Sequence, residues 1–293
     1  MREQRKIYEP GIYTDISNDD YHASAGISRS AISALQLSPL DYWMEYINPH
    51  HEKEAPSETM IMGTVLHTLV LEPHKFADEF LVLPKLDLRT KDGKAEKALF
   101  EEIKGNKQFI KQDLFATARK MADAVLLHPK AAQILNDAVF ENSIYWNDKA
   151  TDALCKTRPD IWNKQIGVVC DLKTARDARP RYFSRTVEDG NYHIQAAMQI
   201  DGIYAATGKR PQDFMFIVVQ NEPPYMPYIY RLDDEAIEAG RREYKEALLI
   251  FRECMKADDW TRDREAIIPI FFTDFQLRKS TFYQLNALYN CIT

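Results

Sequence analysis

The chain is 293 residues long, and hydrophobic residues make up 45% and charged residues 28% of it. This balance is typical of a globular protein and excludes a disordered chain, which combines low hydrophobicity with high charge. The formal net charge of -6 excludes a uniformly basic nucleic-acid-binding protein, so any contact with DNA must come from local clusters of basic residues.

The start of the chain bears on the location of the protein, and the spacing of its cysteines bears on a structural zinc site. The first residues, MREQRKIYEPGIY, contain no apolar run of signal-peptide length, and no segment approaches the roughly 20 apolar residues of a membrane span. We therefore expect a cytoplasmic protein without a membrane partner. The four cysteines lie far apart without a CxxC pair, which argues against a structural zinc site; they are Cys155, Cys170, Cys254 and Cys291.

The first half of the chain is predicted to be helical. Ser28-Arg29-Ser30 precedes the first strong helix and offers serine as a good N-cap, and we expect this helix to be interrupted near Pro39. The next helix carries apolar residues around His67 at one-turn spacing and stops at Pro73, so it should be largely buried. The polar residues within 84–105 predict an exposed loop that leads into another helix. The helices expected before the first strand cover residues 31–47, 58–72, 112–127 and 129–135.

The second half of the chain is predicted to mix strands and helices. The expected strands cover residues 139–147, 153–163, 167–174, 213–221 and 225–232, and the expected helices cover residues 180–187, 192–207 and 233–255. The first three strands should be adjacent, with a hairpin turn at Asn163 and Lys164. The whole pattern predicts an α/β fold with a mixed central sheet flanked by helices and a helical N-terminal part.

No repeat or convincing linker divides the chain, so we expect one domain over residues 1–293. Its core should cover residues 13–232. Residues 233–293 should form a C-terminal helix and an aromatic tail without a clear period.

Pro159-Asp160 followed by Asp171-Leu172-Lys173 is the most informative motif. Across a hairpin, Asp160 and Asp171 can approach one hard divalent cation, and the main-chain carbonyl of Leu172 can supply a further oxygen. Lys173 points to the same face as Asp171 because side chains alternate along a strand. In phosphodiester hydrolysis a metal ion polarises the phosphate and acidifies a bound water, while an ammonium group orients that water or stabilises charge on the phosphate. An Asp-Lys pair at a strand end is also a common surface feature, so this motif alone leaves both interpretations open.

Two helices carry further candidate residues. His67 lies on an apolar helix, where it is either a core histidine with a polar partner or a metal ligand. Tyr192 and Gln195 lie one helical turn apart, and Gln199 lies on the next turn. These three side chains could hydrogen-bond a phosphate or the attacking water, or they could form an ordinary polar stripe on a buried helix.

Two clusters of basic residues could contact DNA or simply be solvated surface. The first cluster consists of Arg176, Arg179, Arg181 and Arg185, and the second of Lys85, Arg89, Lys91, Lys94 and Lys97. We count the first cluster among the predicted DNA-binding residues, together with Ser28 and Arg29 at the start of the first strong helix.

The ordered motifs GTVLH, RPD, DLKT and YHIQ resemble the RecB-like branch of the PD-(D/E)xK nucleases, and most closely the RecE-type exodeoxyribonuclease VIII domain of phages and prophages. The segment GISRSAISALQLSPLDYW is similar to the opening helix of that family, so the resemblance runs from about Tyr13 to Leu232. It implies a restriction-endonuclease-like core and supporting roles for Tyr192 and Gln195. Gln199 departs from the family pattern, in which we expect an aromatic residue. The metal-dependent centre that the resemblance implies consists of His67, Asp160, Asp171 and Lys173.

The resemblance also implies an activity. Such enzymes use Mg²⁺, with Mn²⁺ able to substitute, and degrade one strand of linear duplex DNA from its 5′ end, which leaves a 3′ overhang for a single-strand annealing protein. Related enzymes form rings around DNA, so we expect a homo-oligomer, either a trimer or a tetramer. Two alternatives stay open: a structure-specific DNA endonuclease of the same superfamily, and a non-catalytic DNA-binding module. The intact Asp160, Asp171 and Lys173 favour an enzyme.

Overall fold

The structure is a computed structural model that describes residues 5–51, 55–87 and 89–261. The chain divides into two units, Met1–Asp258 and Asp259–Thr293. Of the second unit only residues 259–261 are described, so the rest of the predicted aromatic tail lies outside the described residues. The single domain expected from the sequence stays a prediction.

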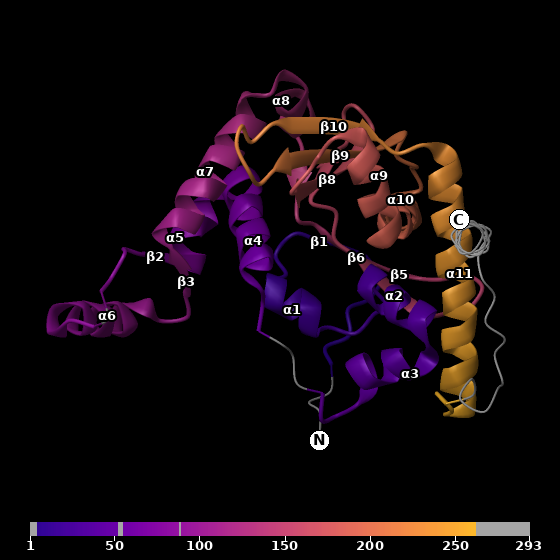
Figure 1. Cartoon of the computed structure of the whole chain (residues 1–293). Coiled ribbons are helices and arrows are strands. Elements are labelled where there is room, and N and C mark those ends of the chain that lie inside the picture. The colour runs from indigo at the N-terminus through magenta and orange to yellow at the C-terminus, as the bar shows by residue number, and fades with distance from the viewer. Residues whose placement is uncertain (1–4, 52–54, 88, 262–293) are drawn as a thin grey trace, which may run out of the picture. The chain divides into compact units, whose positions relative to one another are not determined.

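Helices and strands alternate irregularly along the first unit (Figure 1). The helical elements are α1 (Asn18–Ala23), α2 (Arg29–Leu37), α3 (Pro39–Tyr42), η1 (Trp43–Ile47), α4 (Glu58–Leu71), η2 (Pro73–Lys75), α5 (Phe76–Glu79), α6 (Lys91–Lys104), α7 (Gln112–Leu127), α8 (Pro129–Leu135), α9 (Pro180–Asp189), α10 (Tyr192–Thr207) and α11 (Asp234–Ala257). The strands are β1 (Gly11–Tyr13), β2 (Phe80–Leu83), β3 (Gln108–Lys111), β4 (Val139–Phe140), β5 (Ser143–Asn147), β6 (Leu154–Thr157), β7 (Ile161–Asn163), β8 (Val168–Ala175), β9 (Asp213–Gln220) and β10 (Pro227–Arg231).

A mixed five-stranded sheet forms the centre of the first unit, in the order β10-β9-β8-β7-β4. β7 and β8 form the predicted antiparallel hairpin, β8 and β9 are parallel, and β10 returns antiparallel to β9. Helices α4 and α7 cover one face, and α9 and α10 cover the other (Figure 1). The prediction of a mixed central sheet flanked by helices is confirmed.

The alternation of side chains along β8 separates a core face from a polar face. Leu172 is fully buried together with Ile217 of β9 and the apolar residues of α4 and α7. Burial of one such side chain stabilises the fold by about 1.5–3 kcal/mol. Asp171 and Lys173 point to the opposite face, where Asp171 pairs in register with Phe216, a residue that contacts α9 and α10. The polar residues of β8 therefore meet α10 rather than the apolar core.

The first three predicted strands lie next to one another in the central sheet as β4, β7 and β8, but the first two of them are each broken in the middle. Residues 139–147 divide into β4 and β5, and residues 153–163 divide into β6 and β7. β4 and β7 belong to the central sheet, whereas β5 and β6 form a second sheet with β1. The chain changes sheets at Glu141, which has a φ of 51°, and near Pro159, which has no N–H to donate to a sheet. The expectation of three adjacent strands is therefore confirmed for β4, β7 and β8, whereas the division of the first two strands between two sheets was not expected.

The predicted helix starts and stops in the first half of the chain agree with the structure. The side chain of Ser28 accepts the backbone N–H of Ala31 at 3.4 Å and caps α2, and Pro39 follows the interruption after Leu37. Helix α4 covers the segment around His67 and ends at Leu71. α7 and α8 have the predicted bounds.

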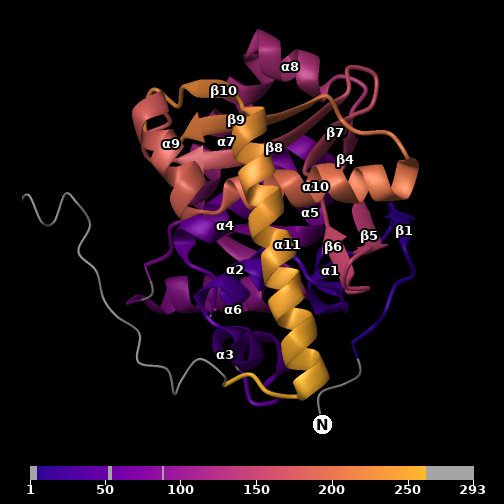
Figure 2. The same cartoon turned by 90° about the vertical axis from the view of Figure 1, so that its right-hand side faces the viewer.

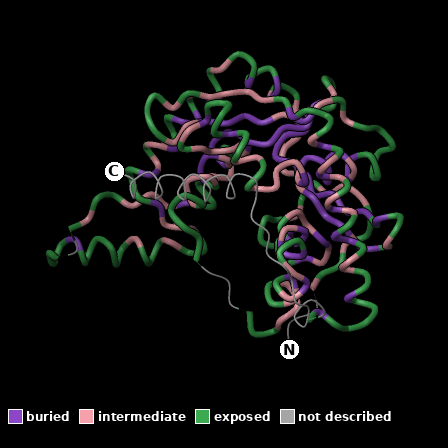
Figure 3. Tube along the Cα trace, turned by 45° about the vertical axis from the view of Figure 1, so that its right-hand side comes forward, coloured by how far each residue is buried: buried purple, intermediate pink, exposed green. Residues whose placement is uncertain are grey.

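The polar segment at residues 84–105 is less of a loop than expected, because α6 begins at Lys91. The hydroxyl of Thr90 accepts the backbone N–H of Gly93 at 3.0 Å, and this cap starts the helix despite the glycine. Figure 3 shows buried residues concentrated in the central strands, whereas α6 is exposed along most of its length. The short elements β1, α1, β2 and β3 were not predicted.

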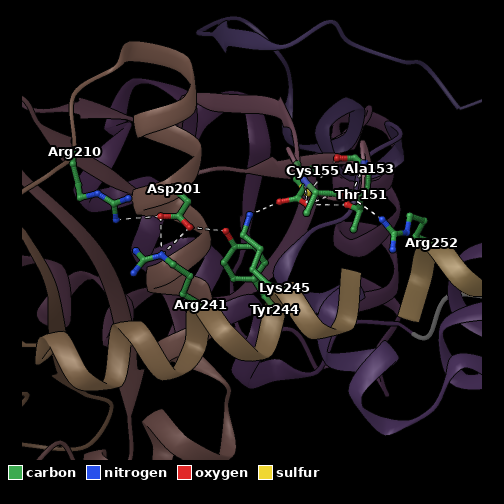
Figure 4. Close-up of polar contacts among 11 residues, drawn as sticks. Thr151, Ala153, Cys155, Asp201, Arg210, Arg241, Tyr244, Lys245 and Arg252 are labelled. Atoms are coloured by element: carbon green, nitrogen blue, oxygen red, sulfur yellow. Dashed lines mark hydrogen bonds and ion pairs between the residues drawn. The ribbon is translucent and has the colours of Figure 1, made fainter. Parts of the chain in front are cut away.

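Helix α11 packs across α10 at a steep angle (Figure 2) and is attached through two carboxylates (Figure 4). Asp201 of α10 accepts hydrogen bonds from Arg241 Nε at 2.9 Å and from the Tyr244 hydroxyl at 2.5 Å. Lys245 forms an ion pair with Asp148, a buried residue in the turn after β5. Charge-assisted bonds of this kind are stronger than neutral ones, so they fix the position of α11 against α10 and the turn after β5.

None of the helices in the described part of the chain is long and apolar enough to cross a membrane.

Candidate active site

A cleft of about 1850 Å³ opens between the N-terminal helices and α4. His67 of α4, Glu141 from the turn between β4 and β5, and Asp160 from just before β7 line it. Gln195 of α10 and Arg29 of α2 line it as well. A cleft of this size can admit a large substrate. His67, Glu141 and Asp160 lie close together in it.

His67 has two different partners for its two ring nitrogens. Its Nε2 lies 2.7 Å from the carbonyl oxygen of Leu172. Because a carbonyl only accepts, Nε2 carries the proton, and this bond fixes the ring orientation. Nδ1 then faces two carboxylates, Asp160 Oδ2 at 3.6 Å and Glu141 Oε1 at 3.9 Å. Three groups rich in lone pairs converge there, so the cluster needs a proton or a metal cation between them.

The pKa values of His67 and Asp160 are both raised, and the neighbouring carboxylates that help to raise them would also attract a cation. Burial, followed by the nearby Asp171, raises the pKa of Asp160 to about 8. Burial alone would lower the pKa of His67, but Asp160 and Glu141 outweigh it and raise the pKa to about 9. The cluster thus binds protons tightly where no metal neutralises its carboxylates.

The donor set fits a divalent cation. One ligand atom from each of His67, Glu141 and Asp160 lies within 4.8 Å of the others. The two carboxylates supply oxygen ligands for a divalent cation that completes its shell with water, and the imidazole supplies a nitrogen ligand of the kind that transition metals accept.

A second polar group lies on the α10 side of β8. Lys173 Nζ is 2.5 Å from Asp171 Oδ2, and Gln195 Nε2 donates to Asp171 Oδ1 at 2.5 Å. The ring of Tyr192 lies under the ammonium, with Nζ 4.7 Å from its centroid. Although burial opposes it, the charge of Asp171 and then that of Asp160 raise the pKa of Lys173, so the lysine is charged at neutral pH.

The backbone of β8 joins the two groups. The N–H of Leu172 donates to Asp160 Oδ2 at 2.8 Å, and the carbonyl of the same residue accepts from His67. The structure therefore brings His67, Asp160, Asp171 and Lys173 together around one residue of β8. The carbonyl of Leu172 uses one lone pair for His67, and its predicted role as a metal ligand stays a prediction.

Glu141 is the member of the cluster that was not predicted from the sequence. It interrupts the apolar run VFENSIYW, which the sequence pattern predicts to be one strand. Its backbone N–H donates to the carbonyl oxygen of Asp160 at 3.2 Å, and this bond holds the two acidic residues together. A charged residue that splits an apolar strand was the available signal.

The predicted DNA-binding residues are at different places. Ser28 and Arg29 line the cleft, and Arg29 donates to the carbonyl oxygen of Gly190 at 3.3 Å. The first basic cluster follows β8: Arg176 lies 3.5 Å from Glu222, Arg179 is paired with Asp177, and Arg181 and Arg185 are exposed on α9. In the second cluster, Arg89 is paired with Asp87, and Lys85, Lys91, Lys94 and Lys97 are exposed.

Gln199 is separate from the catalytic candidates. It lines the cleft one turn beyond Gln195 but is only 1% exposed. Within the described part of the chain, its Oε1 has no hydrogen-bond partner.

A comparison with family models matches residues 28–267 to the PDDEXK-like domain of unknown function (DUF3799). No curated protein sequence matches the chain. Among solved structures, a proposed exonuclease from Eubacterium rectale has a TM-score of 0.59 at 12% identity, covering 90% of this chain and 98% of that one. A phage-related exonuclease from Haemophilus somnus 129PT is 10% identical, and the match covers 58% of this chain and 85% of that one. Its TM-score of 0.32 is too low to carry an argument. The first likeness concerns the fold alone. The family model spans most of the chain. The chain therefore belongs to the PDDEXK-like DUF3799 family, and with that family to the PD-(D/E)xK nuclease superfamily.

Proposed function

We propose that the protein is a metal-dependent exodeoxyribonuclease that hydrolyses phosphodiester bonds of linear double-stranded DNA. The observation that carries this proposal is the pairing, on either side of Leu172, of a His67–Glu141–Asp160 cluster with the Lys173–Asp171 ion pair. A cation site beside a charged lysine provides what phosphodiester hydrolysis requires: neutralisation of the phosphate and activation of water.

Each residue then has a defined task. His67, Glu141 and Asp160 would hold Mg²⁺, with Mn²⁺ able to substitute, and a bound ion of this type polarises the phosphate and lowers the pKa of a water. Lys173 places its ammonium where it can orient that water or stabilise negative charge on the phosphate.

Asp171 and its neighbours keep the lysine in place. Asp171 holds the Lys173 ammonium by an ion pair and is itself oriented by Gln195. The face of the Tyr192 ring attracts the same ammonium from the other side. Asp171 would also lie near the cation, as expected from the sequence, since its charge is close enough to Asp160 to help raise the pKa of that carboxyl.

The resemblance to RecE-type exodeoxyribonuclease VIII supports the finer parts of the proposal. They are degradation from the 5′ end, 3′ overhangs for recombination with a single-strand annealing protein, and a ring-shaped trimer or tetramer around DNA. In such a ring a few basic residues facing the DNA are enough to bind phosphates. Arg181 and Arg185 are suitable because both are exposed on one face of α9.

Incubation of the purified protein with linear and covalently closed circular duplex DNA, with Mg²⁺ or with EDTA, tests the proposal. We expect loss of linear DNA only, only with metal, and not with Asp171→Ala. Separate 5′ and 3′ end labels report the polarity. Cutting of closed circles would instead indicate an endonuclease of the same superfamily, and binding without cleavage in every condition would indicate a non-catalytic module.

A further inference from the structure

A row of polar contacts joins α2 to the turn between α9 and α10. Arg29 of α2 donates to the carbonyl oxygen of Gly190 at 3.3 Å. Asn191 Nδ2 donates to Ser33 Oγ and to Gln36 Oε1, both at 3.2 Å. Because residues 29, 33 and 36 recur at helical spacing, they form one stripe on α2. This stripe faces the start of α10.

Glu243 of α11 completes the row. Its Oε2 accepts from Gln36 Nε2 at 3.1 Å, and both of its carboxylate oxygens lie 3.2 Å from His193 Nε2. Gly240 allows this approach, because a Cβ there would lie 2.3 Å from the carbonyl oxygen of His193. One carboxylate therefore contacts both α2 and α10.

The residue that begins α10 has a conformation that needs support. Asn191 has a φ of 53°, in the left-handed region, which asparagine tolerates better than most residues. Its side chain is held by α2, and its carbonyl oxygen accepts the N–H of Gln195 at 3.2 Å. The first turn of α10 thus takes its position from contacts with α2 and α11.

We propose that Gln36, Asn191 and Glu243 form a polar clasp that positions Tyr192 and Gln195 against the Lys173–Asp171 pair. This inference rests on the proposed function. In the described part of the chain, Asp171 and Lys173 are contacted by Gln195 and Tyr192 and not by the three clasp residues. The clasp residues are therefore positioning residues. Displacement of a catalytic group by about 1 Å can lower a rate by about a hundredfold. The short Gln195–Asp171 contact would be sensitive to such a shift.

Cleavage kinetics on linear duplex DNA test the clasp. We expect Glu243→Ala and Gln36→Ala each to lower kcat by about tenfold while KM for DNA changes little, because the first turn of α10 is displaced rather than the DNA-binding surface removed. The double variant should be slowed by less than the product of the two single effects, because the two residues share one contact, although Gln36 also bonds Asn191 and Glu243 also contacts His193. Glu243→Gln keeps an oxygen acceptor and should recover part of the rate. The matched control is Glu246→Ala, an exposed glutamate three residues further along α11.

A second measurement does not depend on cleavage. Amide hydrogen exchange of residues 192–196 should be about tenfold faster in Glu243→Ala than in wild type, and unchanged in Glu246→Ala. Asn191→Gly should give the same increase, because glycine adopts the left-handed backbone but lacks both side-chain bonds.

The outcomes separate the two proposals. If wild type cleaves DNA and the clasp variants match Glu246→Ala in both kcat and exchange, the clasp is overturned and the proposed function stands. If wild type does not cleave DNA but exchange at residues 192–196 rises as expected, the proposed function fails and the clasp still holds the start of α10. An equal increase of exchange throughout the central sheet would mean general destabilisation and would also overturn the clasp.

Discussion

The ion pair between Lys173 and Asp171 allows stability and activity to be separated. Asp171 is fully buried, and its Oδ2 lies 2.5 Å from Lys173 Nζ. Lys173→Met keeps most of the side-chain volume but leaves the buried carboxylate with Gln195 as its remaining side-chain donor. Removing one partner of a buried ion pair costs about 3–5 kcal/mol. At roughly 2–4 °C per kcal/mol for a unit of this size, we expect the Tm measured in EDTA to fall by about 10 °C.

The double variant Asp171→Asn with Lys173→Met should behave differently. It removes both charges, and the asparagine can still accept the hydrogen bond from Gln195. Replacing both members of a buried pair is often nearly neutral, so we expect the free energy of unfolding to return to within about 1 kcal/mol of wild type. Cleavage should stay at least about a hundredfold below wild type in both variants, because the ammonium and the carboxylate are absent from the site.

Thermal unfolding followed by circular dichroism in EDTA measures the Tm, urea unfolding measures the free energy of unfolding, and digestion of linear duplex DNA with Mg²⁺ measures the activity. Lys130→Met, an exposed lysine of α8, is the control and should change neither. If Lys173→Met is as stable as wild type, or if the double variant unfolds as easily as the single one, then Lys173 does not neutralise a buried Asp171 and the reasoning is refuted.

Three further predictions concern the metal cluster and α11. Glu141→Gln removes a carboxylate near His67, so Mn²⁺ affinity measured by calorimetry should fall at least about tenfold; unchanged affinity would mean that Glu141 is not a ligand. In metal-free protein the pKa of His67 rises from 6.5 to about 9 and that of Asp160 from 3.8 to about 8. The folded state then binds more protons than the unfolded state, so the free energy of unfolding in EDTA should fall between pH 6.5 and 9, and a rise would contradict the cluster. Asp201→Ala leaves the hydroxyl of Tyr244 without its acceptor and Arg241 with only the more exposed Glu238, and should destabilise the protein by about 2–4 kcal/mol in urea unfolding; a loss below about 0.5 kcal/mol would mean that this carboxylate does not hold α11.

The parts of the site that lie on one short stretch of chain could be predicted from the sequence. The hairpin of β7 and β8 follows from two apolar runs separated by a turn, and alternation along β8 puts Asp171 and Lys173 on one face. His67 was placed correctly on a helix because one-turn apolar spacing surrounds it. These features depend on local periodicity, which a sequence shows directly.

The parts that depend on tertiary contacts could not be predicted. Glu141 enters the cluster because the chain changes sheets at that residue, where its φ is 51°. Its charge marks a break in the apolar run, but nothing in the spacing indicates that the break brings Glu141 next to Asp160. Likewise, nothing in the spacing of Gln36, Asn191 and Glu243 indicates that α2, α10 and α11 meet at one point. Residues from distant segments are brought together by packing, which periodicity does not encode.

The position of β8 between two helix layers explains why so many charged groups tolerate burial here. Asp160 and Asp171 are both nearly inaccessible, and an isolated buried carboxylate would be strongly unfavourable. Each layer supplies a different compensation: His67 from the α4 side, and Gln195 from the α10 side. The compensation stays incomplete on the His67 side, where burial and then the charge of Asp171 raise the pKa of Asp160 despite the nearby His67. A divalent cation supplies that charge, so metal binding should stabilise the fold by mass action as well as enable the chemistry.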